Sequence, residues 1–156
     1  MSKSLNRVKA ALDAAGLSAR IVEMDSETRT AQQAADAAGC VLDQIVKSII
    51  FRGEDTGHVI LFLTAGGNRV SADKASAVAG QRLGKADADL VRAETGFAIG
   101  GVAPIGHLTE IKSYFDPKLL AFAEVWAAAG TPRHIFSAEP RALLAVTGAE
   151  TADFIE

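Results

Sequence analysis

Ile45-Val-Lys-Ser-Ile-Ile-Phe51 is the stretch that decides the fold, because β-branched and aromatic residues favour an extended strand. Glu54-Asp-Thr-Gly57 predicts a turn after it, and His58 to Thr64 predicts a second strand. Two such strands joined by a short turn predict a hairpin. Because side chains alternate along a strand, Lys47 shares a face with apolar neighbours. Its ammonium group either reaches water along its methylene stem, as on an edge strand, or lies in a polar cleft.

Helical spacing and capping residues surround this hairpin. The pattern predicts helices from Ser2 or Ser4 to about residue 15, over 30–38, 71–79 and 86–95, and from residue 137 or 140 to 147. Further strands are predicted over 19–24, 108–115, 119–126 and 134–136. Strands and helices do not alternate regularly, which predicts an α+β (mixed α/β) domain around one curved mixed sheet.

Two capping signals within this pattern are specific. Thr30 with Gln33 has the form of a capping box, and Ser71 precedes the next helix. Ser71 and Lys74 also match a Ser-x-x-Lys pattern found in β-lactamase-type enzymes, but the two companion motifs are absent. A helix cap therefore explains Ser71 better than a nucleophile does.

Length and composition predict one domain without linkers. The chain has 156 residues, of which 49% are hydrophobic and 22% charged, enough for a core of its own. No apolar run approaches the ~18 residues of a membrane span, and no apolar segment follows the first residues as in a secretory signal. The single cysteine, Cys40, excludes an intrachain disulfide. We expect a single freestanding domain over 1–156, in the cytoplasm and without a membrane partner.

The charge is small and unevenly distributed. The net charge is −3, with about +2 in residues 1–85 and −5 in residues 86–156. Proteins that hold a long duplex by counterion release are normally basic, so we expect no DNA partner. An anionic ligand would more readily meet the first half of the chain.

A glycine-rich segment, Gly100-Gly-Val-Ala-Pro-Ile-Gly106, is the second candidate for a site. Such a loop lets the backbone approach a ligand and present N–H groups to an anion or an oxyanion, although a tight connection between strands would look the same. His107 follows the loop directly. Neither His58, His107 nor His134 has the spacing of a metal site, and no protein nucleophile stands out.

Two segments taken together resemble a known family. Gln44-Ile-Val-Lys-Ser-Ile-Ile-Phe51 resembles the lysine strand, and Thr95 to His107 the Gly-x-x-x-Pro loop, of the YbaK/prolyl-tRNA-synthetase-associated (ProX-like) editing domains. Residues 30–35 and 68–86 are similar to the same family, so the resemblance spans roughly 20–150. It implies a partly barrel-like mixed sheet with helices outside, and hydrolysis in trans of the ester that joins a wrong amino acid to tRNA.

The resemblance also implies roles for individual residues. Lys47 would contact the terminal ribose–phosphate or the ester of the mischarged tRNA 3′ end. Gly100 and Gly101 would offer N–H groups to the aminoacyl carbonyl. Pro104 would hold the shape of the loop, and Gly106 would let the chain pass closely. The remaining substrate-binding positions would be Thr30, Ser48, His107 and His134, with no metal or organic cofactor.

Some positions depart from the family pattern, and other functions stay open. Members that clear Cys-tRNA(Pro) have a tyrosine where this chain has Glu23 and Met24, a serine at Ala128 and an aspartate at His134. The amino acid removed is therefore not predicted. The alternatives are a non-catalytic module that binds the aminoacyl-tRNA end, a subunit that docks on a synthetase through an exposed apolar patch around Phe122 and Trp126, and a hydrolase of other small esters.

Overall fold

The computed structural model describes residues 2–28 and 30–156, and within them eight strands form one mixed sheet in the order β1-β7-β6-β2-β3-β5-β8, with β4 paired to β2. This confirms the predicted mixed α/β class. The strands are β1 (Ile21–Glu23), β2 (Ile45–Gly53), β3 (Val59–Ala65), β4 (Leu83–Lys85), β5 (Lys112–Phe115), β6 (Val125–Ala128), β7 (His134–Ala138) and β8 (Glu150–Thr151). The helices are α1 (Lys3–Ala14), α2 (Ala31–Ala38), α3 (Ala72–Ala79), α4 (Ala88–Thr95) and α5 (Pro140–Thr147), with short 3₁₀ turns η1 (Leu42–Gln44) and η2 (Pro117–Ala121).

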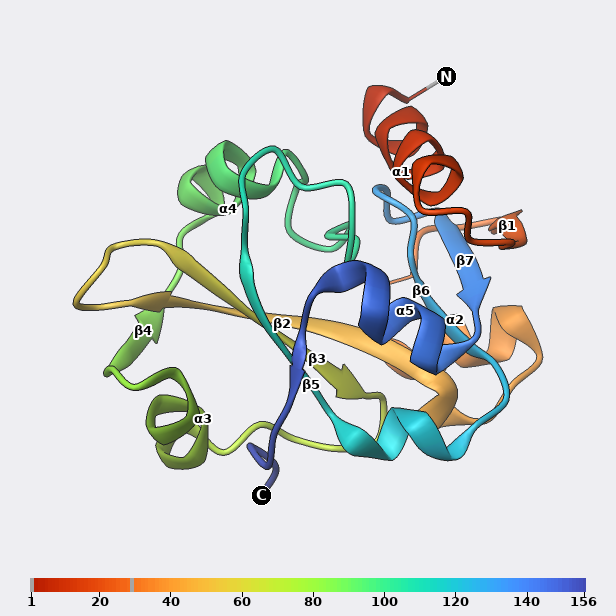
Figure 1. Cartoon of the computed structure of the whole chain (residues 1–156). Coiled ribbons are helices and arrows are strands. Elements are labelled where there is room, and N and C mark those ends of the chain that lie inside the picture. The colour runs from red at the N-terminus through yellow and green to blue at the C-terminus, as the bar shows by residue number, and fades with distance from the viewer. Residues whose placement is uncertain (1, 29) are drawn as a thin grey trace.

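The predicted hairpin forms the centre of the sheet. β2 pairs antiparallel with β3 in continuous register from Val46 opposite Ala65 to Arg52 opposite Val59. In Figure 1 this hairpin crosses the molecule, with β4, α3 and α4 towards one end and α1, β1 and β7 towards the other. All seven residues of β3 are buried, because other strands flank it on both sides. β2 pairs with three strands, β3, β4 and β6, but Lys47 lies in the part of β2 that pairs only with β3.

Helix boundaries follow the predicted caps. Ser2, Thr30 and Ser71 each accept a hydrogen bond from a backbone N–H in the first turn of the helix that follows. The confirmed cap role of Ser71 accounts for the Ser-x-x-Lys pattern. The last helix is capped by Glu139 instead of Ser137, whose side chain lies buried in β7.

Two strand predictions were wrong in part, and two short strands were missed. The strand expected over 119–126 is the 3₁₀ turn η2 followed by β6, because Pro117 and the Asp116 cap begin a helical turn there. The strand expected over 108–115 begins only at Lys112. β4 and β8 were not predicted, because strands of three and two residues are too short to show a period.

The sheet separates the apolar core into clusters on its two faces. The largest lies beneath α1 and α5 and includes Val8, Leu63, Phe115, Phe136 and Leu143. On the other face, Trp126 and Ile45 pack against α2, and Phe62 stacks on Tyr114 and meets Phe154 edge-on near α3. No helix among the described residues has the length and apolar character needed to cross a membrane.

Candidate functional site

The sheet is interrupted along one edge of β2. β6 pairs only with Ile45 and Val46, and β4 pairs only with the last three residues of β2, from Phe51. In the described chain, residues 47–50 therefore have β3 on one side and no strand on the other. Gly53 N–H donates to His58 of the hairpin partner, so by alternation Ser48 turns its N–H and C=O towards the interruption.

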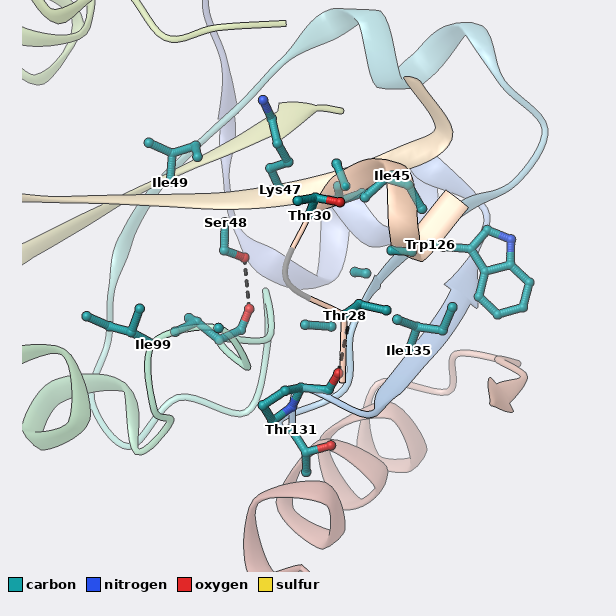
Figure 2. Close-up of a pocket in the computed structure, with 18 of the residues that line it drawn as sticks. Thr28, Thr30, Ile45, Lys47, Ser48, Ile49, Ile99, Trp126, Thr131 and Ile135 are labelled. Carbon is teal, nitrogen blue, oxygen red and sulfur yellow. Dashed lines mark hydrogen bonds between the residues drawn. The ribbon is translucent and has the colours of Figure 1, made fainter. Parts of the chain in front are cut away.

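A cleft of about 640 Å³ occupies this interruption. It is within the size range of ordinary small-molecule sites. Figure 2 shows the side chains of Lys47 and Ser48 on opposite sides of β2. Both residues line the cleft, so β2 contributes an ammonium group on one of its sides and a hydroxyl group on the other. One wall is apolar and contains Ala31, Ala34, Ile45, Trp126 and Ile135, whereas the polar lining groups are Glu27, Thr28, Thr30, Lys47, Ser48, Thr131 and His134.

Lys47 lies on the rim of the cleft with its ammonium group held in place. Its Nζ donates to the backbone carbonyl of Asn68 at 2.5 Å. Burial lowers the pKa of Lys47, and the positive charge of Arg69 lowers it further, whereas Asp116 and Asp43 act in the opposite direction. The residue is thus a partly desolvated cation, and such a cation interacts more strongly with an anionic ligand than one in open water does.

The glycine-rich loop forms the opposite wall of the cleft. Gly100 and Val102 line it, and the N–H of neither has a hydrogen-bond partner among the described residues. Gly100 adopts φ +95°, which an L side chain rarely tolerates. Gly101 differs from its predicted role, because its N–H donates to Ala98 O at 3.0 Å and it does not line the cleft.

Gly101 instead sets how closely the loop packs. A Cβ at this position would lie 2.9 Å from Cα of Thr131 and 3.0 Å from its carbonyl carbon. The loop therefore rests on the backbone of the 130–132 turn. Across the cleft, Ser48 Oγ donates to Val102 O at 2.9 Å and ties the loop to β2 (Figure 2).

His134 lines the cleft in a fixed orientation. Its Nδ1 lies 2.6 Å from Thr131 Oγ1, and its Nε2 lies 4.0 Å from a carboxylate oxygen of Glu23. Beside it, Thr28 donates from Oγ1 to Pro132 O at 3.3 Å, so residues before α2 are joined to this turn. Thr30, the exposed cap of α2, completes the rim.

Besides Gly101, three predicted site residues do not line this cleft. Pro104, Gly106 and His107 line a separate hollow beside α1. His107 Nε2 bonds to Ala103 O at 2.7 Å, and burial lowers the pKa of its ring. The structure thus brings together Thr30, Lys47, Ser48, Gly100 and His134, while His107 contacts the core through Phe97.

Several lining residues were not predicted. Thr28, Thr131, Val102 and Ile99 reach the cleft through loops, for which no periodic signal exists. The alternative of a synthetase-docking subunit placed Trp126 in an exposed patch, but Trp126 is 3% exposed and packs under α2. Phe122 is also partly buried against the core, so this pair forms no exposed anchor.

Comparison with known proteins decides the family. The family model named aminoacyl-tRNA editing domain matches residues 25–146. This range covers most of the chain and includes every residue that lines the cleft. The chain belongs to the aminoacyl-tRNA editing domain family. The editing domain is 32% identical over 123 residues to the uncharacterized protein YwhH of Bacillus subtilis strain 168, covering 79% of this chain and 78% of YwhH.

Solved structures agree with this assignment. A candidate trans-editing enzyme for prolyl-tRNA synthetase superposes with a TM-score of 0.92 at 48% identity, over 100% of this editing domain and 99% of that chain. Hypothetical protein APE2540 superposes with a TM-score of 0.87 at 31% identity, over 96% and 99% of the two chains. The fold expected from the resemblance is thereby confirmed.

Proposed function

We propose that this editing domain is an aminoacyl-tRNA deacylase that acts in trans on mischarged tRNA. The observation that carries the proposal is the cleft at the sheet interruption, with the Lys47 ammonium on one side of β2 and, on the loop opposite, the Gly100 N–H, which bonds to none of the described residues. A cation and a backbone donor are the groups that an ester next to a phosphodiester requires. The tRNA 3′ end, and not a free amino acid, is the ligand that uses both.

The proposed reaction is hydrolysis without a covalent enzyme intermediate. Lys47 pairs with the terminal ribose–phosphate region, while the N–H of Gly100 stabilises the carbonyl oxygen as it becomes an oxyanion. Water, oriented by the free ribose hydroxyl, adds to the carbonyl carbon. The bond from that carbon to the ribose oxygen then breaks, and the ribose oxygen takes up a proton that the attacking water has released. The amino acid and the tRNA then separate.

The apolar wall supports selection by size. Ala31, Ala34, Ile45, Trp126 and Ile135 leave no charged group for a polar amino-acid side chain on that wall. A pocket of this kind separates side chains that differ by one methylene by only ~10–200-fold, so exclusion of bulky residues is its stronger effect. We propose small amino acids as the ones removed, and the cytoplasm, where tRNA is charged, as the site of action.

A panel of mischarged tRNAs tests the proposal. Purified protein is incubated with Ala-, Cys-, Ser- and Thr-charged tRNAs, including tRNA(Pro) and tRNA(Ala), beside a buffer blank. Rapid deacylation of one or two members supports editing and names the substrate. Survival of every member at the blank rate, together with binding of a non-hydrolysable aminoacyl-tRNA mimic, would establish the non-catalytic binding module instead.

The alkaline side of the pH profile should report on Lys47. Its charged form is the active one, so the deacylation rate above the blank should fall as pH rises through its pKa. Because burial and Arg69 lower that pKa, the fall should begin at a lower pH than for a solvent-exposed lysine. Single-turnover rates measured across the alkaline range, each corrected for spontaneous hydrolysis, check this. A rate above the blank that does not fall would contradict it.

Ser48→Ala should weaken the link between β2 and the loop. Loss of the bond to Val102 O should cost about 1 kcal/mol of unfolding free energy. The loosened loop should also slow deacylation by about tenfold, because the donor at Gly100 is then less well aligned. Ser48→Thr keeps the hydroxyl and is the control. Denaturant unfolding and single-turnover rates are the two measurements, and equal rates for Ala and Thr variants would contradict the role.

A further inference from the structure

The turn after β3 supports the Lys47 ammonium through a chain of hydrogen bonds. Lys47 Nζ donates to the carbonyl of Asn68, and Asn68 Nδ2 donates to Asp116 Oδ2 at 2.9 Å. We infer that Asp116, acting through Asn68, is a positioning residue for Lys47. The proposal deepens the proposed function, on which its activity readout rests.

Asp116 is built to be an immobile anchor. Asp116 is 2% exposed. Its carboxylate oxygens accept two backbone hydrogen bonds, from Ala65 N–H at 3.0 Å and from Lys118 N–H at 2.9 Å. A buried carboxylate with this many donors is fixed in position, and its removal would leave them unpaired. Asp116 thereby joins the end of β3, the turn at Asn68 and η2.

Hydrogen bonds also hold the backbone of the turn that contains Asn68, and this fixes the position of the carbonyl to which Lys47 donates. Asn68 N–H donates to Ala65 O at 2.9 Å, and Gly67 N–H donates to Asp43 Oδ1 at 2.8 Å. After Asn68, the carbonyl of Arg69 accepts from Glu156 N–H at 2.9 Å, so the chain is held both before and after the Asn68 carbonyl that receives the ammonium. An ammonium on a flexible four-carbon stem needs such an acceptor to occupy one place at the rim.

Charge gives this arrangement a second effect that can be measured. Four charged groups act together here: the Lys47 ammonium, Arg69 beside Asn68, and the carboxylates of Asp43 and Asp116. Burial and Arg69 lower the pKa of Lys47, whereas the two carboxylates oppose them. Loss of the Asp116 charge should therefore move the pKa of Lys47 further down, an effect that a purely structural tie would not have.

Two variants and one matched control test the inference. Asp116→Asn removes the charge and disturbs the anchor, whereas Asn68→Ala removes only the side-chain link and keeps the backbone carbonyl. Asp153→Asn is the control, because Asp153 pairs with Lys74 at 3.1 Å on the exposed surface. The Lys47 ammonium is titrated by NMR on protein with ¹³C-methylated lysines, with Lys47→Arg used to assign its signal. Deacylation rates and thermal unfolding are measured alongside.

We expect Asp116→Asn to lower the pKa of Lys47 and shift the alkaline fall in rate to lower pH. Asp116→Asn and Asn68→Ala should both deacylate about tenfold more slowly or worse, since misplacement of a reacting group is costly. Asp153→Asn should change neither readout. A wild-type Lys47 titration in folded Asp116→Asn, or wild-type rates in folded Asn68→Ala, would overturn the inference. If the wild-type protein deacylates nothing, the proposed function fails, while the Lys47 titration still judges the positioning role.

Discussion

Lys47→Ala should slow hydrolysis of the preferred mischarged tRNA by about 10²–10³, the cost of losing one well-placed electrostatic group. The ammonium lies on the rim of the cleft, donates to the Asn68 carbonyl and to no other described residue, and is partly desolvated. Its removal should leave the fold intact, because burial disfavours its charge and no ion pair depends on it in the described chain. Single-turnover deacylation and thermal unfolding of the same preparation separate the two effects.

Two lysine variants make this result interpretable. Lys74→Ala removes the same kind of side chain from a surface pair with Asp153 and should keep the wild-type rate. Lys47→Arg keeps the charge on a planar group of different reach, and should recover part of the rate if phosphate pairing is the main role. A Lys47→Ala protein that deacylates as fast as the wild type would exclude Lys47 from the reaction.

Gly100→Ala should reduce deacylation by about 10², with only a small loss of stability. At φ +95° a Cβ costs roughly 1–2 kcal/mol, and the loop can relieve that strain only by rotating the peptide that carries the unpaired N–H. The donor is then displaced from the position it has in the wall of the cleft. Rates of single-turnover deacylation, beside the free energy of unfolding in urea, measure the two consequences.

Gly57→Ala is the matched control for backbone strain. Gly57 lies in the β2–β3 turn at φ +76°, and a Cβ there, as at Gly100, meets nothing within 4 Å. The two variants should therefore lose similar stability while only Gly100→Ala loses activity. Equal activity in both would mean that the loop backbone does not act on the substrate.

Much of the fold could be predicted because its elements carry strong local signals. The β2–β3 hairpin has a segment rich in β-branched and other apolar residues on each side of a turn, and α2 has the Thr30 cap at its start. β4 and β8 carry no such signal, since short strands are defined by the neighbour they pair with. Tertiary pairing, and not local preference, makes them strands.

The candidate site could be predicted only where a motif marked it. Lys47, Ser48 and Gly100 lie in segments whose composition is unusual, and the structure brings them to one cleft. His107 shares the same motif but turns to the other side of its loop, and no pattern in sequence encodes that direction. Asp116 and Asn68 lie 48 positions apart, so their contact exists only after β3 and β5 have paired.

The interruption in the sheet has a consequence for how such a protein diversifies. On the loop wall, the groups proposed to bind the ester are main-chain N–H groups, which a substitution preserves as long as Gly100 keeps its φ of +95°. The apolar wall, in contrast, is made of side chains from α2, β2, β6 and β7 that can be exchanged one at a time. Under the proposed function, the preference of the enzyme for the amino acid that it removes can therefore change during evolution while the backbone of the glycine-rich loop stays the same.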